Sequence, residues 1–300
     1  MRLPGRVTVV EVGPRDGLQN EPALLPTAVK IGLVDRLSAA GLPAVEAASF
    51  VSPRWVPQLA DGAQVLGGIR RRPGTRYAAL VPNRRGLEAA AAAGVDEVAV
   101  FTAASEAFTR RNVNASIDET LSRFAEVAEG ARARGLRLRG YVSCALGCPY
   151  EGAVAPEAVA AVAGRLLDLG CQEISLGDTI GVGTPGQAAA LVDAVAVRVP
   201  RERLAVHFHD TYGQALANVL AALERGVATV DASVGGLGGC PYAPGASGNL
   251  ATEDLVYMLD GLGVETGVDL DRLLEANRFV ADRLGRPVGT KVGRARAGRG

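Results

Sequence analysis

Short β-branched runs alternate with longer amphipathic patterns from one end of this 300-residue chain to the other. This alternation predicts parallel strands joined by crossover helices. Eight strands are expected, at residues 7–12, 44–48, 76–81, 97–101, 136–143, 173–176, 204–209 and 228–233. Eight strand-then-helix units over about 260 residues fit a (β/α)₈ TIM barrel, an α/β fold of about 250 residues.

Local signals mark where several of the connecting helices begin and end. A helix is expected over residues 27–40, because its apolar side chains share one face and Gly41 follows as a C-cap. Ser116 and Glu119 have the spacing of a capping box. Thr184 followed by Pro185 is typical of an N-cap with proline in the first turn.

The C-terminal region predicts one helix beyond the eight units, over residues 268–284. The last stretch, residues 286–300, is basic and glycine-rich, and we expect it to be a flexible tail. Without a recognisable linker, the chain is predicted to have a single TIM-barrel catalytic domain, residues 1–285.

An open doubly wound sheet is the alternative fold. That fold often has a glycine-rich nucleotide-binding turn after its first strand. Here the first strand is followed by Gly13-Pro14-Arg15-Asp16-Gly17, which does not match that fingerprint. The number of repeating units and this turn therefore favour the barrel.

The charge balance and the cysteine content narrow the class of protein. Thirty-two basic residues balance thirty-two acidic ones, so the net charge gives no reason to expect nucleic acid or an anionic membrane as a partner. Four cysteines are too few for a disulfide framework, and we expect a reducing, cytoplasmic location. No apolar run reaches the length of a membrane span, and no targeting segment is expected.

The two histidines of the chain lie two positions apart, at His207 and His209. A strand directs residues i and i+2 to the same face, with Cα atoms roughly 6.6 Å apart. At a strand's carboxyl end, two such imidazoles can converge on one divalent cation. The alternative is a hydrogen-bonded polar pair with no metal.

Polar residues gather where the predicted strands end, which is where barrel enzymes carry their chemistry. Asp16, His207, His209 and Asn249 would together offer nitrogen and oxygen ligands without a thiolate. Such a set suits Mg²⁺ or Mn²⁺ better than structural zinc, and Fe²⁺ stays open. A non-haem iron oxygenase also uses two histidines and one carboxylate, but the eight-unit pattern gives that interpretation no support.

Other polar residues at the strand ends have structural alternatives. Arg15 and Asp16 could form a simple surface ion pair. Glu46 would be costly to bury alone and could pair with an arginine for structural reasons. Asp178 could merely start a turn.

The cysteines also divide into two groups. Cys144, Cys148 and Cys171 are expected to be packing residues. Cys240 differs, because it lies in a segment, residues 235–249, that is too rich in glycine to be core. A thiol there is a candidate for chemistry, although a solvent-facing thiol without a role is the alternative.

Several of these stretches closely resemble the hydroxymethylglutaryl-CoA lyase family. The matching runs are residues 12–21, 49–53, 55–58, 144–152, 177–181, 207–213, 235–249 and 251–254, within a resemblance that covers about residues 7–285. Three residues depart from the family pattern: Pro22 replaces lysine, Ala48 replaces threonine and Thr102 replaces glycine. These departures bear on the shape of the acyl pocket more than on the reaction.

The resemblance implies a TIM barrel that cleaves 3-hydroxy-3-methylglutaryl-CoA to acetyl-CoA and acetoacetate by retro-Claisen chemistry assisted by Mg²⁺ or Mn²⁺. It implies an acyl-CoA substrate and a role in leucine degradation and ketone body formation. Separately, we expect the protein to form a homodimer. The implied metal ligands are Asp16, His207, His209 and Asn249.

The resemblance also implies roles in the reaction itself. Asp16 or His207 would help to remove the hydroxyl proton, and Arg15 would stabilise the enolate oxygen. Cys240 would protonate the enolate carbon. Glu46 and Asp178 would orient the other groups.

Three other functions are open at this point. A related lyase could act on a longer 3-hydroxyacyl-CoA. A condensing synthase resembles this barrel but usually carries further C-terminal domains. A metal-binding barrel without catalysis is the alternative from a different class.

Overall fold

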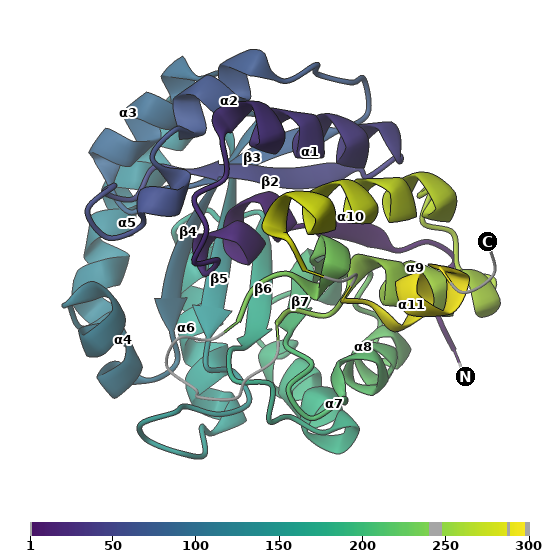
Figure 1. Cartoon of the computed structure of the whole chain (residues 1–300). Coiled ribbons are helices and arrows are strands. Elements are labelled where there is room, and N and C mark those ends of the chain that lie inside the picture. Colours follow the sequence, from purple (N-terminus) through teal and green to yellow (C-terminus); the bar gives the residue numbers. More distant parts are fainter. Residues whose placement is uncertain (1, 240–247, 287–288, 298–300) are drawn as a thin grey trace.

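The computed structural model describes residues 2–239, 248–286 and 289–297. Eight parallel strands close into a barrel in sequence order, with β8 hydrogen-bonded to β1 (Figure 1). The strands are β1 Thr8–Glu11, β2 Ala44–Ser49, β3 Arg76–Leu80, β4 Glu97–Ala103, β5 Arg137–Ser143, β6 Glu173–Asp178, β7 Leu204–Phe208 and β8 Thr229–Ala232. The predicted TIM barrel is confirmed, and each predicted strand has a counterpart.

Helices surround the barrel. Eight of the described helices each follow one strand of the barrel and complete its βα unit: α1 Thr27–Ala39, α2 Gly62–Gly68, α3 Arg84–Ala92, α5 Ile117–Ala133, α6 Pro156–Asp168, α7 Pro185–Val195, α8 Ala215–Glu224 and α9 Thr252–Gly261. Three further helices are α4 Glu106–Val113, α10 Leu270–Leu284 and α11 Lys291–Ala297. No described helix has both the length and the apolar character that a membrane crossing requires.

The strands form in runs of residues that are mostly apolar on both faces of the strand. Side chains that point outward pack against helices, and those that point inward fill the barrel. Every residue of β2, β6, β7 and β8 is buried. Charged residues inside these strands therefore face partners within the barrel. The interior of the barrel is therefore partly polar.

The predicted helix boundaries are confirmed by their caps. At the start of α5, the Ser116 hydroxyl accepts the Glu119 N–H at 3.1 Å, and the Glu119 carboxylate accepts the Ser116 N–H at 2.7 Å. After α1, Gly41 has a φ of +90°, and a Cβ there would lie 2.5 Å from the Gly267 carbonyl oxygen. That position therefore requires glycine.

The additional C-terminal helix is also confirmed. Helix α10 packs beside α1 (Figure 1). Between them, the Arg36 guanidinium lies 3.8 Å from the Phe279 ring centroid. Asp269, which caps α10, donates its backbone N–H to the Ala40 carbonyl at 2.8 Å. Helix α10 therefore packs on the outside of the barrel against α1, the first helix of the chain.

Part of the segment for which the sequence predicts a flexible tail is helical. The Asp254 carboxylate accepts the backbone N–H groups of Lys291 and Val292, at 3.2 and 2.9 Å, at the start of α11. The Lys291 ammonium donates to Asp210, one residue after His209, at 2.9 Å. The division into a barrel of residues 1–285 and a tail of 286–300 stays a prediction.

Candidate active site

A single tight turn at the end of β1 positions Arg15 and Asp16. The turn, η1 (Gly13–Gly17), forms because the backbone N–H groups of Arg15, Asp16 and Gly17 all point at the Val12 carbonyl oxygen. A Cβ on Gly13 would lie 2.6 Å from a Glu11 carboxylate oxygen, so the close approach requires glycine. The turn brings both charged side chains over the barrel mouth.

The two histidines come together with Asp16 at this mouth. The Nε2 atoms of His207 and His209 lie 3.3 Å apart, and His207 Nε2 lies 3.8 Å from Asp16 Oδ2. One ligating atom from each of the three residues falls within 4.8 Å of the others. The juxtaposition predicted from the His-x-His spacing is therefore present.

Asn249 lies beside the same cluster. Its side-chain NH₂ group donates to Asp16 Oδ2 at 2.8 Å and to the Leu237 carbonyl at 3.0 Å, and its backbone bridges to His209. All four residues proposed as ligands thus meet, although Asn249 contacts the cluster through its nitrogen. Coordination by Asn249 stays a prediction.

Arg15 lies between two carboxylates. Its Nε donates to Glu46 Oε2 at 2.5 Å and its Nη1 donates to Asp16 Oδ1 at 2.7 Å. Only 6% of Arg15 is exposed, so the alternative of a surface ion pair is wrong. The sequence left open that Glu46 pairs with an arginine only for structural reasons. Glu46 does pair with an arginine, but that arginine is Arg15, which belongs to the candidate site.

Burial and neighbouring charges set the protonation of the cluster. Burial alone raises the pKa of Asp16, but the Arg15 guanidinium and the imidazoles lower it to about 2. Burial and the adjacent His207 lower the pKa of His209 to about 4. At neutral pH the cluster therefore offers an ionised carboxylate and a neutral imidazole, the states in which these groups bind metals.

Glu46 and Asp178 lie behind this cluster. Burial raises the pKa of Glu46, although the Arg15 guanidinium opposes the shift. The Asp178 carboxylate accepts the N–H groups of Val182 at 3.2 Å and Gly183 at 2.8 Å. Asp178 therefore stabilises the turn after β6, which is the structural role that the sequence left open for it. A role for Asp178 in orienting other groups during the reaction stays a prediction.

The cysteines divide as expected where the structure describes them. Cys144, Cys148 and Cys171 are buried, and Cys144 and Cys148 pack with Phe108 in a small apolar cluster. Cys240 lies outside the described residues.

Sequence analysis missed several residues that contact the cluster from inside the barrel. The Tyr141 ring meets the His207 ring edge-on, with centroids 6.1 Å apart. Asp231 Oδ2 lies 3.3 Å from His207 Nδ1. A charged residue within the apolar run of β8 was the available signal for Asp231, of the same kind that identified Glu46 in β2.

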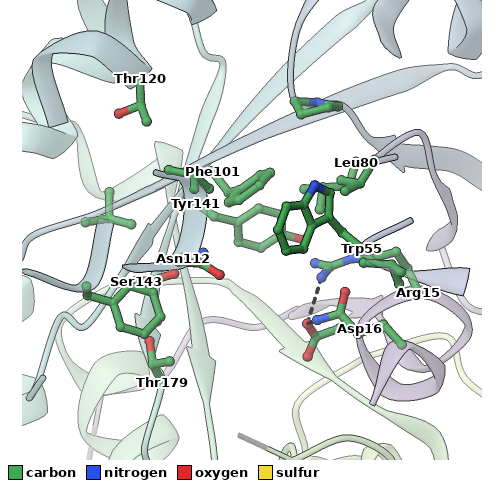
Figure 2. A pocket seen from close by; sticks show the side chains of 18 of the residues that line it. Arg15, Asp16, Trp55, Leu80, Phe101, Asn112, Thr120, Tyr141, Ser143 and Thr179 are labelled. Atoms are coloured by element: carbon green, nitrogen blue, oxygen red, sulfur yellow. Dashed lines mark hydrogen bonds and ion pairs between the residues drawn. The ribbon is translucent and has the colours of Figure 1, made fainter. Parts of the chain in front are cut away.

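A cavity of about 830 Å³ opens beside the cluster. Figure 2 shows Arg15 and Asp16 on one side, Asn112 and Thr120 on the other, and aromatic rings between them. The apolar lining comes from Val51, Trp55, Val56, Leu80, Phe101, Phe108, Phe124, Tyr141 and Val142. The Trp55 side chain is largely exposed, so the cavity reaches the surface. Such a cavity suits an elongated, partly apolar ligand.

The cluster fits a divalent cation on chemical grounds. Two imidazole nitrogens 3.3 Å apart must either share a proton or bind a common cation, because two lone pairs at that distance repel. A carboxylate beside them supplies negative charge, and the described part of this cluster contains no thiolate. This donor set is one that hard or borderline divalent ions accept.

Curated relatives resemble almost the whole chain. The hydroxymethylglutaryl-CoA lyase of Bos taurus is 62% identical over 293 residues, which is 98% of this chain and 90% of the relative. The cytoplasmic 3-hydroxy-3-methylglutaryl-CoA lyase of Danio rerio is 60% identical, over 98% of this chain and 88% of the relative.

These relatives overturn the expectation of a cytoplasmic location. The proteins from Bos taurus, Rattus norvegicus, Mus musculus and Homo sapiens are named mitochondrial, whereas the Danio rerio protein is named cytoplasmic. The prediction was wrong because cysteine usage separates oxidising from reducing compartments and does not distinguish between two reducing ones.

Solved structures agree over the same length. A hydroxymethylglutaryl-CoA lyase from Pseudomonas aeruginosa superposes with a TM-score of 0.98 at 58% identity and covers 100% of both chains. A lyase from Acinetobacter baumannii, solved with coenzyme A and 3-methylmalate, has a TM-score of 0.93 at 40% identity, over 97% of this chain and 95% of that one. The HMGL-like family model matches residues 6–280. On this match and these identities, the chain belongs to the HMGL-like family.

Proposed function

We propose that this protein is a hydroxymethylglutaryl-CoA lyase, which cleaves 3-hydroxy-3-methylglutaryl-CoA to acetyl-CoA and acetoacetate. The observation that carries the proposal is the cluster of Asp16, His207 and His209 beside Arg15 in one cavity. Relatives that bear this activity in their names are about 60% identical over nearly the full chain, which supports the same substrate.

The reaction moves one proton away from oxygen and returns one to carbon. The C3 hydroxyl loses its proton, the C2–C3 bond breaks, and the C3 carbon becomes the ketone of acetoacetate. The electron pair of the broken bond moves to the thioester oxygen and forms an enolate. A proton delivered to the C2 carbon then completes acetyl-CoA.

The side chains at the mouth suit these steps. Asp16 or His207 would accept the hydroxyl proton at the edge of the cluster. Arg15 is always cationic and buried, and it is held by Glu46 and Asp16, so it can face the enolate oxygen without reorganising. Cys240 would deliver the proton to carbon, from a glycine-rich segment that could exclude water.

Asp16, His207 and His209, with the Asn249 amide oxygen, would hold Mg²⁺ or Mn²⁺. When bound, such a cation would lower the pKa of a hydroxyl group beside it and offset developing negative charge. The ionised Asp16 and the neutral His209 are already in the protonation states that this binding requires.

The rest of the cavity would hold the acyl-CoA. A lyase of this family has been solved with coenzyme A and 3-methylmalate, which supports a site that takes both an acyl group and the carrier. The apolar lining near Phe101 and Trp55 suits the pantetheine arm, and Arg111 and Arg123 add positive charge to the wall of the cavity. A homodimer and the place in leucine degradation and ketone body formation stay predictions.

An assay for acetoacetate release tests the proposal. The purified protein should release acetoacetate from 3-hydroxy-3-methylglutaryl-CoA with Mg²⁺ or Mn²⁺ present and lose activity in a chelator. Asp16→Asn should lower kcat at least about a hundredfold. Asp193→Asn, the same substitution on the exposed face of α7, should leave kcat unchanged.

Faster turnover of a longer 3-hydroxyacyl-CoA would favour the related lyase instead. No product from any acyl-CoA would favour a metal-binding barrel without catalysis. Full activity of Asp16→Asn would separate the cluster from the reaction.

A further inference from the structure

Asp231 lies inside the barrel, directly beneath the metal-binding cluster. Strands β7 and β8 pair with His207 opposite Asp231, so the register itself places the carboxylate next to the imidazole. His207 Nδ1 is buried and makes no hydrogen bond to a described residue, and its charged neighbour is Asp231 Oδ2, 3.3 Å away. Asp231 is only 1% exposed, so water does not compete for this contact.

Other strands of the barrel hold the Asp231 carboxylate in place. Arg139 of β5 donates from Nη2 to Oδ1 at 2.6 Å and from Nη1 to Oδ2 at 3.1 Å. The Ser175 hydroxyl of β6 donates to Oδ2 at 2.8 Å. Three neighbouring donors therefore fix both oxygens, and Oδ2 also faces the imidazole.

A carboxylate held in this way can only accept hydrogen bonds. The proton of a neutral His207 ring is therefore favoured on Nδ1, beside Asp231, which leaves the lone pair of Nε2 free. That Nε2 atom faces His209 and Asp16. We propose that Asp231 is a positioning residue that fixes the tautomer and orientation of His207 for metal binding. The inference rests on the metal site of the proposed function.

The Asp231→Asn substitution should reverse the tautomer. The amide oxygen is expected at the Oδ1 position, because Arg139 makes its shortest contact there and requires an acceptor. The amide NH₂ then takes the Oδ2 position and donates to His207 Nδ1. The His207 proton must move to Nε2, where a metal would bind, as in the protease triad variant in which aspartate becomes asparagine.

Nitrogen NMR of the metal-free protein tests this directly. The chain has two histidines, so labelling with ¹⁵N-histidine gives only two rings, and a His209→Gln sample assigns them. At about pH 9, where a free imidazole is neutral, wild-type His207 should carry its proton on Nδ1, and Asp231→Asn should carry it on Nε2. A wild-type ring protonated on Nε2 alone overturns the inference, even if the variant does not fold.

Mn²⁺ binding, followed by the loss of the free-ion EPR signal, gives a second readout. Asp231→Asn should bind Mn²⁺ about 10- to 100-fold more weakly than the wild type. The matched control is Glu173→Gln, which removes the other carboxylate bonded to Arg139, at 2.7 Å, and should keep wild-type affinity within a few-fold.

The outcomes separate this inference from the proposed function. Equal Mn²⁺ affinity in Asp231→Asn and the wild type overturns the role of Asp231 and leaves the lyase assignment intact. Equal weakening in Glu173→Gln also overturns it, because general damage to the Arg139 network would then explain the loss. Absence of Mn²⁺ binding in the wild type overturns the metal site and the inference together.

Discussion

The buried carboxyl group of Glu253 should make the stability of this protein fall as the pH rises. Glu253 lies in the first turn of α9, and its oxygens accept the Gly235 N–H at 3.1 Å and the Asn277 amide at 2.7 Å. It is fully buried, and burial, despite these hydrogen bonds, raises its pKa from 4.5 to about 8. Between those two values the folded protein holds a proton that the unfolded chain has released.

The sign and size of the effect follow from proton linkage. Stability falls with pH wherever the folded state binds more protons than the unfolded state. The stability linked to the Glu253 proton is fully present below pH 4.5 and is lost as the pH rises to about 8. A difference of about 3.5 pKa units corresponds to about 5 kcal/mol. Glu11, whose pKa burial raises to about 7, adds a loss of the same sign.

Glu253→Gln tests this expectation, because glutamine resembles the protonated acid and cannot ionise. In urea unfolding at about pH 4, where the Glu253 carboxyl group is largely protonated in both the folded and the unfolded chain, the variant should match the wild type within about 1 kcal/mol, since it keeps an acceptor oxygen. At about pH 9 it should be more stable than the wild type by several kcal/mol. Glu88→Gln, an exposed site on α3, is the control and should follow the wild-type profile. Parallel profiles for Glu253→Gln and the wild type would refute the buried-proton argument.

Three further variants extend the account. Arg15→Gln should lower kcat about 10²- to 10³-fold with a smaller loss of thermal stability, because Glu46 can take up a proton; a collapse of Tm with normal kcat would contradict this. Cys240→Ala should keep Mn²⁺ affinity and lose most turnover, and unchanged turnover would remove this thiol from the reaction. Gly181→Ala should destabilise the fold by about 1–2 kcal/mol, because the φ of Gly181 is +66°. It should also weaken Mn²⁺ binding, because the new Cβ would lie 2.9 Å from the carbonyl oxygen of His209, a proposed metal ligand. Gly186→Ala, in open space on α7, is its control and should leave both quantities unchanged.

The strands and long helices could be predicted because their signals are local. The apolar run before His207 and the capping box at Ser116 are legible without tertiary structure. Helix α11 could not be predicted from local sequence, because its N-terminus is hydrogen-bonded to the Asp254 carboxylate, 37 residues before Lys291. A glycine-rich basic sequence becomes helical there only when the barrel brings that carboxylate to it.

In the candidate site, too, some residues could be predicted from the sequence and others could not. The two histidines and Asp16 could be placed together because a strand period and a barrel mouth suffice to predict it. The support from Asp231 could not be predicted, because Arg139 lies 92 residues away and the two meet only when the barrel closes. Sequence reasoning identified the residues at the strand ends and missed the interior residues beneath them.

Pulsed EPR of the Mn²⁺-loaded protein, prepared with ¹⁵N-histidine, tests the central claim most directly. Because the chain has only two histidines, every strong ¹⁵N coupling must come from His207 or His209. We predict couplings from two directly bound imidazoles in the wild type and from one in His209→Gln. A bound Mn²⁺ ion with no imidazole coupling would contradict a metal site formed by Asp16, His207 and His209.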